Sequence, residues 1–166
     1  IGTCLVGSEM CIRDSTLPAT VADQPATANR EAYDHYLTAL AFMRRQHNPP
    51  ADLRIATAEL ERAVALDAEF AHAHAYLAIL HSRIYHYADT SDEQAERARL
   101  AATRALELNP DLGEAHSAWG FYQHIVVRDQ AAAEASFLKA KAVMPNDEIV
   151  NAGLSGSYYM RGDTEK

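Results

Sequence analysis

The chain has 166 residues, 48% of them hydrophobic, and its 15 Lys and Arg residues face 23 Asp and Glu residues, which gives a formal net charge of -8 at pH 7. An acidic chain without clustered Lys and Arg lacks the charge pattern of a nucleic-acid-binding segment, so no nucleic-acid partner is expected for it. The longest uninterrupted apolar run, Ala75 to Leu80, is far shorter than the roughly 20 residues of a membrane-spanning helix. No membrane span is therefore expected in this segment.

Residues 1–15 differ in character from the rest of the chain and contain both cysteines, Cys4 and Cys11. The stretch that ends at Ser15, CLVGSEMCIRDS, resembles the in-frame translation of a sequencing-library adapter, so we expect residues 1–15 to be a disordered adapter artefact. The Pro-containing segment 16–28 is typical of a linker. Residues 29–166, the expected domain, then hold no cysteine, which excludes a disulfide scaffold, a thiolate zinc site and a cysteine nucleophile there.

From Asn29 onward the pattern is helical almost without a break. Alanine, the strongest helix former, accounts for 32 residues, and apolar residues recur at helical spacing while strand patterns are absent. We predict an all-α fold, with helices over 30–46, 52–66, 70–87, 92–108, 112–126, 130–144 and 147–161. Ser91 with Gln94, and Asp111 with Glu114, are expected to cap two of these helices as capping boxes.

One phrase of small and bulky residues recurs along the predicted helices. Its copies are Ala56, Leu60, Ala63 and Ala68, then Ala98, Ala102, Ala105 and Pro110, then Ala133, Phe137, Ala140 and Pro145. A second pattern precedes the later copies, with Leu77-Ala78 at the positions that match Trp119-Gly120. Because these positions fall on one stripe of each helix, we expect their small side chains to let neighbouring helices approach closely.

These motifs resemble those of tetratricopeptide-repeat (TPR) proteins. The TPR unit of about 34 residues is a helix pair with W-x2-L-G-x2-Y on the first helix and A-x3-F-x2-A-x4-P on the second. The third copy meets the second-helix pattern in full, whereas Ala68 replaces the proline of the first copy and Ala102 replaces the bulky residue of the second. The resemblance implies a right-handed α-solenoid of antiparallel helix pairs with about 3.5 repeats.

Two groups of aromatic residues lie at the edges of this repeat pattern. The run Tyr-His-Tyr at 85–87 lies at a turn longer than the family's, where it either caps the core or serves as a recognition element. Tyr158 and Tyr159 lie in a fourth unit that would stop in mid-repeat at Lys166. We therefore expect a domain truncated at its C-terminus, in which these tyrosines and Leu154 lack a packing partner.

Stacked helix pairs form a concave groove from their first helices. At the groove positions of the TPR family this chain holds His72, Ile79, Arg83, Glu114, Phe121 and His124. Their mixture of apolar and charged side chains implies a protein or peptide ligand; the alternative is that Ile79 and Phe121 pack within the molecule against a missing continuation of the chain. One TPR class binds a C-terminal carboxylate through Lys and Asn, but His72, Ala75 and Ile79 occupy those positions here, so that binding mode is not expected.

The eight histidines raise the question of a metal site. His72 and His74 are two residues apart, whereas metal ligands on a helix lie at i and i+4, and His74 shares its repeat position with His116. Packing or solvent-facing histidines are therefore favoured, and neither a metal nor a cofactor is expected. The sequence holds no nucleophile elbow, phosphate loop or dinucleotide fingerprint, so it predicts a protein that is not an enzyme.

The first predicted helix and the turn after it, from Asn29 to Pro50, carry a second resemblance. They are similar to the start of TPR regions in bacterial signalling proteins, where an adenylate or guanylate cyclase, a Ser/Thr kinase or a winged-helix activator precedes the repeats. None of the catalytic or DNA-binding motifs of those modules occurs here. Two functions stay open: a scaffold that binds a peptide or partner domain, and a regulatory segment whose partners are other domains of its own full-length chain.

Overall fold

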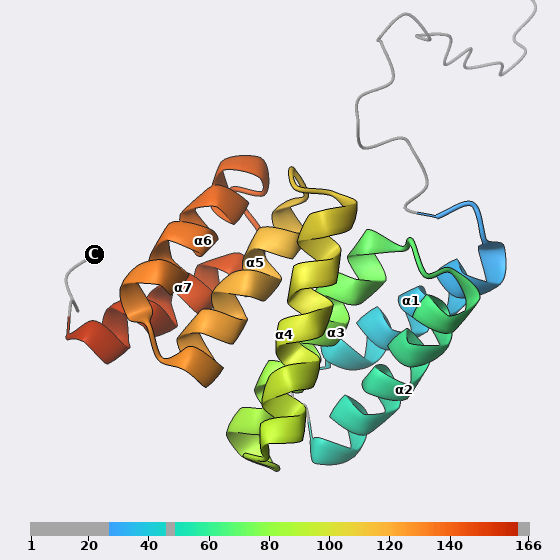
Figure 1. The fold of residues 1–166 in the computed structure, drawn as a ribbon, viewed down its shortest axis with the longest axis horizontal. Helices are drawn as coiled ribbons and strands as arrows, with labels where there is room; N and C mark the ends of the chain where they lie inside the picture. Colours follow the sequence, from blue (N-terminus) through green and yellow to red (C-terminus); the bar gives the residue numbers. More distant parts are fainter. Residues whose placement is uncertain (1–26, 46–48, 163–166) are drawn as a thin grey trace, which may run out of the picture.

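The computed structural model describes residues 27–45 and 49–162, and within these ranges it is all-helical, with no β-strand. The expected artefact, residues 1–15, and most of the expected linker lie outside the described residues. The helices are α1 (Arg30–Met43), α2 (Pro50–Leu66), α3 (Ala71–Tyr87), α4 (Asp92–Leu108), α5 (Gly113–Phe121), the π-helical segment η2 (Tyr122–Val127), α6 (Gln130–Val143) and α7 (Glu148–Arg161). Figure 1 shows them in chain order across the molecule, from α1 and α2 at one end to α6 and α7 at the other.

Side-chain caps define the starts of four helices. The side chains of Asn29, Ser91, Asp129 and Asp147 each accept a hydrogen bond from the backbone N–H three residues on, which satisfies a donor that the first turn leaves unpaired. The expected cap at Asp111 is wrong, because α5 begins at Gly113 after Leu112, without a side-chain cap. Asp111 lies instead in the turn after α4, where its N–H donates to Asn109 Oδ1 at 3.1 Å.

The expected helix over 112–126 changes geometry in its second half. After Phe121 the chain continues as the π-helical segment η2, which ends where Arg128 adopts a left-handed conformation with φ 63°. The Arg128 N–H donates to the carbonyl of Gln123, and the Gln130 side chain donates to the carbonyl of His124 at 3.2 Å. The widened turn is thus stabilised from its own end and from the start of α6.

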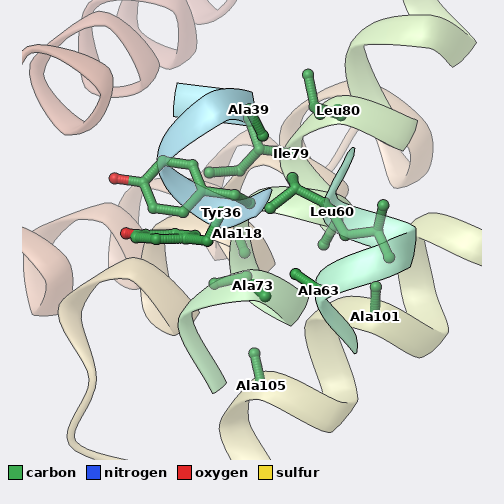
Figure 2. Packing of buried hydrophobic residues seen from close by; sticks show 14 of the residues in the cluster. Tyr36, Ala39, Leu60, Ala63, Ala73, Ile79, Leu80, Ala101, Ala105 and Ala118 are labelled. Atoms are coloured by element: carbon green, nitrogen blue, oxygen red, sulfur yellow. The ribbon is translucent and has the colours of Figure 1, made fainter. Parts of the chain in front are cut away.

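Helices that are adjacent in the chain pack as pairs, α1 with α2, α3 with α4 and α5 with α6, while α7 packs on α6 and α5. Helix α3 is central, since it also contacts α2 and α5 and every residue from Ala75 to Ser82 is buried. Figure 2 shows alanines of several helices around the larger side chains of Tyr36, Leu60 and Ile79. Small residues at these contacts let helix backbones approach closely while larger ones fill the space between them.

The recurring sequence positions face the core. Fully buried, with no exposed surface, are Ala56, Leu60, Ala63, Ala78, Ala98, Ala102, Ala105, Ala133, Phe137 and Ala140; Leu77 and Gly120 are also buried, and Trp119 is half-buried. The expectation that Leu154 and Tyr158 lack a packing partner is wrong, because Leu154 is only 4% exposed and Tyr158 packs against the same cluster of buried residues; Tyr159 is 72% exposed. Leu154 belongs to the cluster around Phe137 and Val150, so α6 supplies the packing partner that it was expected to lack.

Phe137 of α6 sits against two glycines that come from different helices. A Cβ atom built on Gly120 of α5 would lie 2.7 Å from the Phe137 ring, and one built on Gly153 of α7 would lie 2.5 Å from it. Such distances are too short for carbon atoms in contact, and the ring is fully buried. The two glycines therefore let α5 and α7 approach α6 from two sides.

We predict that Gly153→Ala lowers the free energy of unfolding by about 1–3 kcal/mol, since the added methyl group would overlap a rigid, buried ring. The matched control is Gly113→Ala, whose methyl group would meet the flexible Met144 side chain at 2.9 Å and should cost less stability than Gly153→Ala, because Met adapts to a changed space more easily than a buried ring. Urea denaturation followed by circular dichroism measures both. Equal stability of the two variants would contradict the close packing assigned to Gly153.

Candidate functional site

A groove with a volume of about 360 Å³ lies between α3, the α5–η2 segment and α7. It is lined by Ile79, Arg83, His86, Tyr87, Phe121, His124, Ile125, Glu148, Ile149, Ala152 and Gly153. All of these residues belong to α3, α5, η2 or α7, and none belongs to α2, α4 or α6. The floor is mostly apolar, and of the two charged residues Arg83 is half-buried and Glu148 is exposed.

The structure brings together four of the six predicted groove residues: Ile79, Arg83, Phe121 and His124. Glu114 lines a small recess next to the groove, with a volume of about 10 Å³. Ile79 is only 2% exposed and Phe121 makes an edge-on contact with Phe137, with ring centroids 5.1 Å apart. Both residues therefore pack within the molecule and also form the groove floor, so the two readings of them are compatible.

His72 does not line the groove. Its ring lies 6.4 Å from that of Tyr36 and 6.2 Å from that of Phe70, measured between centroids. The Nδ1 atom is buried without a hydrogen-bond partner among the described residues. His72 is thus placed at the packing contact between α1 and the start of α3, away from the other predicted groove residues.

His124 is held in place by neighbours on α6 and α7. Its Nδ1 atom lies 2.5 Å from Gln130 Oε1 and 3.5 Å from Ser157 Oγ. The amide nitrogen of Gln130 donates to the backbone carbonyl of His124 at 3.2 Å. Two contacts from one glutamine therefore fix both the backbone and the ring of this groove residue.

Several lining residues were missed by sequence reasoning. Ile149 and Ala152 come from α7, whose groove positions the repeat mapping did not include, and Ile125 comes from the π-helical turn. His86 and Tyr87 lie in the aromatic run already singled out at 85–87, and their rings make an edge-on contact with centroids 4.5 Å apart. Extending the repeat register into the fourth unit would have found the α7 residues.

A second cavity of about 660 Å³ continues the groove toward α1, and the two share Arg83, Glu148 and Ile149. Its other lining residues are Leu40, Met43, Arg44, Arg45, Tyr76, Asn146 and Asp147. The lining of the two cavities comes from α1, α3, α5 with η2, and α7, and from the turns next to α1 and α7. Because α1, α3 and α5 are the first helices of the three pairs, we call the two cavities together the first-helix groove. It is long enough to contact elements from both ends of the described helical region.

Burial disfavours the charged form of the two tyrosines beside this groove. It raises the pKa of Tyr36 far above its ordinary value and that of Tyr76 to about 12. The charge of Glu114 adds to both shifts, whereas the side-chain hydrogen bond between the two tyrosines lowers the pKa of Tyr76. Their rings lie edge-on with centroids 5.8 Å apart. Both phenols therefore stay neutral at physiological pH.

The opposite face of α3 carries two further histidines and a cavity of about 480 Å³, lined by α2, α3 and α4 residues that include His74, His81 and Arg97. His81 is 3% exposed and its Nδ1 atom lies 2.9 Å from Gln94 Oε1. Burial lowers the pKa of both histidines, although hydrogen bonds oppose the shift. Among the described residues, no three His, Cys, Asp or Glu side chains are grouped so that they could hold a metal ion.

No protein-family model matches the chain, and the curated proteins give no significant match.

Across the described residues, none of the helices combines the length and the apolar character needed to cross a membrane.

Because the pKa of His81 is lowered in the folded state, we predict that acidification destabilises the protein through this residue. As the pH falls through about 6.5, the unfolded chain binds a proton that folded His81 resists, so the free energy of unfolding decreases. The variant His81→Gln keeps a donor for Gln94 but cannot titrate, so it should lose less stability between about pH 7.5 and pH 5.5.

Urea denaturation at both pH values measures this difference. The control is His86→Gln, the same substitution at an exposed histidine of α3, against which the pH dependence of His81→Gln is compared. An identical loss of stability in His81→Gln and in the parent chain would contradict the prediction.

Proposed function

We propose that this chain is a TPR-like scaffold without catalytic activity, which binds an extended peptide or a segment of a partner protein in the first-helix groove. The helix pairs would form a right-handed α-solenoid, as the sequence resemblance implies. One observation carries the proposal: the groove lining comes from α3, α5 with η2, and α7. These are the helices that would be the first members of successive repeats, whose side chains line the concave surface of such solenoids.

The repeated burial pattern supports the helical-repeat part of the proposal. The small residues at corresponding positions of α2, α4 and α6, such as Ala63, Ala105 and Ala140, are all fully buried. Each helix pair also contacts the next pair along the chain, through α2 with α3 and through α4 with α5. Contacts of this kind between neighbouring units are what stabilises a repeat protein.

The shape and chemistry of the groove support a peptide ligand. Two cavities that share lining residues form an elongated surface, which suits an extended chain better than a compact molecule. The apolar floor of Ile79, Phe121 and Ile149 can bury side chains of a ligand.

The proposal is tested by selecting binders from a phage-displayed library of random peptides on the 166-residue chain. Ala152 lines the groove and is exposed on α7, so Ala152→Trp should fill part of the groove without removing a core contact. We predict that this variant weakens the selected peptides at least about tenfold, which corresponds to about 1.4 kcal/mol, as measured by fluorescence polarisation.

The matched control is Ala135→Trp, an equal change at an exposed position of α6 outside the groove, and it should leave affinity unchanged. Circular dichroism melting checks that both variants fold. Selection of no peptide, or of peptides that bind Ala152→Trp and the parent chain equally well, would refute the proposed function.

A further inference from the structure

The first-helix groove holds two arginines that lack an ionic partner within the described part of the chain. Arg44 follows α1 and is exposed, whereas Arg83 lies on α3 and is half-buried. Both line the cavity that continues the groove toward α1. Neither guanidinium group makes a hydrogen bond or salt bridge to another described side chain, while Arg45 beside them pairs with Asp52 at 3.3 Å.

Most other arginines on the described helices pair with carboxylates. Examples are Arg62 with Glu59, Arg97 with Glu93, Arg99 with Glu96, Arg104 with Glu107 and Arg161 with Glu134. In a chain with a net charge of -8, acidic partners are plentiful. Two arginines without such partners therefore leave a local positive charge on one wall of the groove.

Neutral hydrogen-bond donors lie beside this charge. Tyr76 lines the same cavity as Arg44 and Arg83, and Arg44 is near enough to both Tyr36 and Tyr76 to affect their titration. The rings of the two tyrosines are in contact, and their phenols remain protonated. Guanidinium and phenol groups together form a donor-rich wall, which suits a carboxylate acceptor.

The acidic groups of the same cavity lie at its α7 end. Asp147 is occupied as the N-cap of α7, since its side chain accepts from the N–H of Val150 at 2.9 Å. Glu148 is exposed in the first turn of α7 and lines both cavities. Tyr76 lies near Glu114 and Asp147, whose charges raise its pKa, so a ligand carboxylate is directed toward Arg44 and Arg83, away from the start of α7.

The apolar floor lies directly beside this wall, because Arg83 and Ile149 line both cavities. We propose that the ligand of the groove is an extended peptide with an acidic side chain that pairs with Arg83 and Arg44. A large apolar side chain, close to the acidic one in the peptide sequence, packs on Ile79, Phe121 and Ile149. This inference rests on the proposed function and names the partner's chemistry. Its acidic group is a side chain, so a free peptide C-terminus is not required.

The experiment uses the phage-displayed random library on the whole chain, followed by synthesis of the enriched peptides with amidated C-termini. We expect Asp or Glu to be enriched within about three residues of Leu, Ile, Phe or Trp, the spacing that an extended strand of about 3.3 Å per residue allows between adjoining cavities. Arg83→Gln and Arg44→Gln should each weaken these peptides about tenfold, as expected for loss of a charge-assisted hydrogen bond.

The matched control is Arg104→Gln, on the opposite face of the molecule in the cavity beside α4, and it should leave affinity unchanged. Since Arg44 is exposed, its variant tests the inference even if the half-buried Arg83 affects folding. A double variant, Arg44→Glu with Arg83→Glu, should shift selection from acidic to basic peptides. Raising the salt concentration should weaken binding to the parent chain more than binding to Arg44→Gln.

The outcomes separate this inference from the proposed function. Peptides that are blocked by Ala152→Trp but show no acidic enrichment would overturn the inference and leave the groove function standing. Peptides that bind only with a free C-terminal carboxylate would also overturn it, since the acidic group would then be the chain end. Absence of any peptide sensitive to Ala152→Trp would overturn both.

Discussion

The close packing of Phe137 between glycines of two other helices is the contact on which the C-terminal half of the structure depends. Gly120 and Gly153 leave no room for a side chain at this ring, so α5, α6 and α7 meet at distances that only glycine allows. The same glycine of α7 lines the groove. The packing that holds α7 in place therefore also sets the separation between α7 and α3, which is the width of the candidate binding surface.

The π-helical turn after α5 links this packing to the composition of the groove. A regular α-helix through 122–127 would present its side chains at different angles, because a π-turn contains an additional residue. The turn ends at the left-handed Arg128, and Gln130 contacts both the ring and the carbonyl of His124. His124 and Ile125 are thus placed on the groove wall by contacts with α6. Such π-turns occur frequently at functional sites, which agrees with a binding role for this wall.

Periodicity was sufficient to predict the all-helical fold and the core-facing side of α2 to α6, because small and apolar residues recur at the spacing of helical contacts. The resemblance to TPR proteins, rather than periodicity, supplied Ile79, Arg83, Phe121 and His124, which the structure places around one groove. Periodicity could not show the π-turn, which depends on the conformation of Arg128 and on a side chain of the next helix. Periodicity also could not show that the Asn109 side chain accepts a hydrogen bond from the Asp111 N–H in a turn. The position of His72 depends on ring contacts across helices, which local sequence does not encode.

The charge pattern of the groove follows from the direction of its helices. The partial positive charge at the start of α7 stabilises Asp147 and Glu148 without an arginine partner, and Asp147 also accepts a backbone hydrogen bond. At the other end of the cavity, Arg44 follows the end of α1, where the partial negative charge of the helix C-terminus favours a cation. Asp147, Glu148 and Arg44 are therefore each stabilised by their own helix. Arg44 can remain without a carboxylate partner in an acidic protein because its position does not depend on a salt bridge, and its donors stay available at the groove surface.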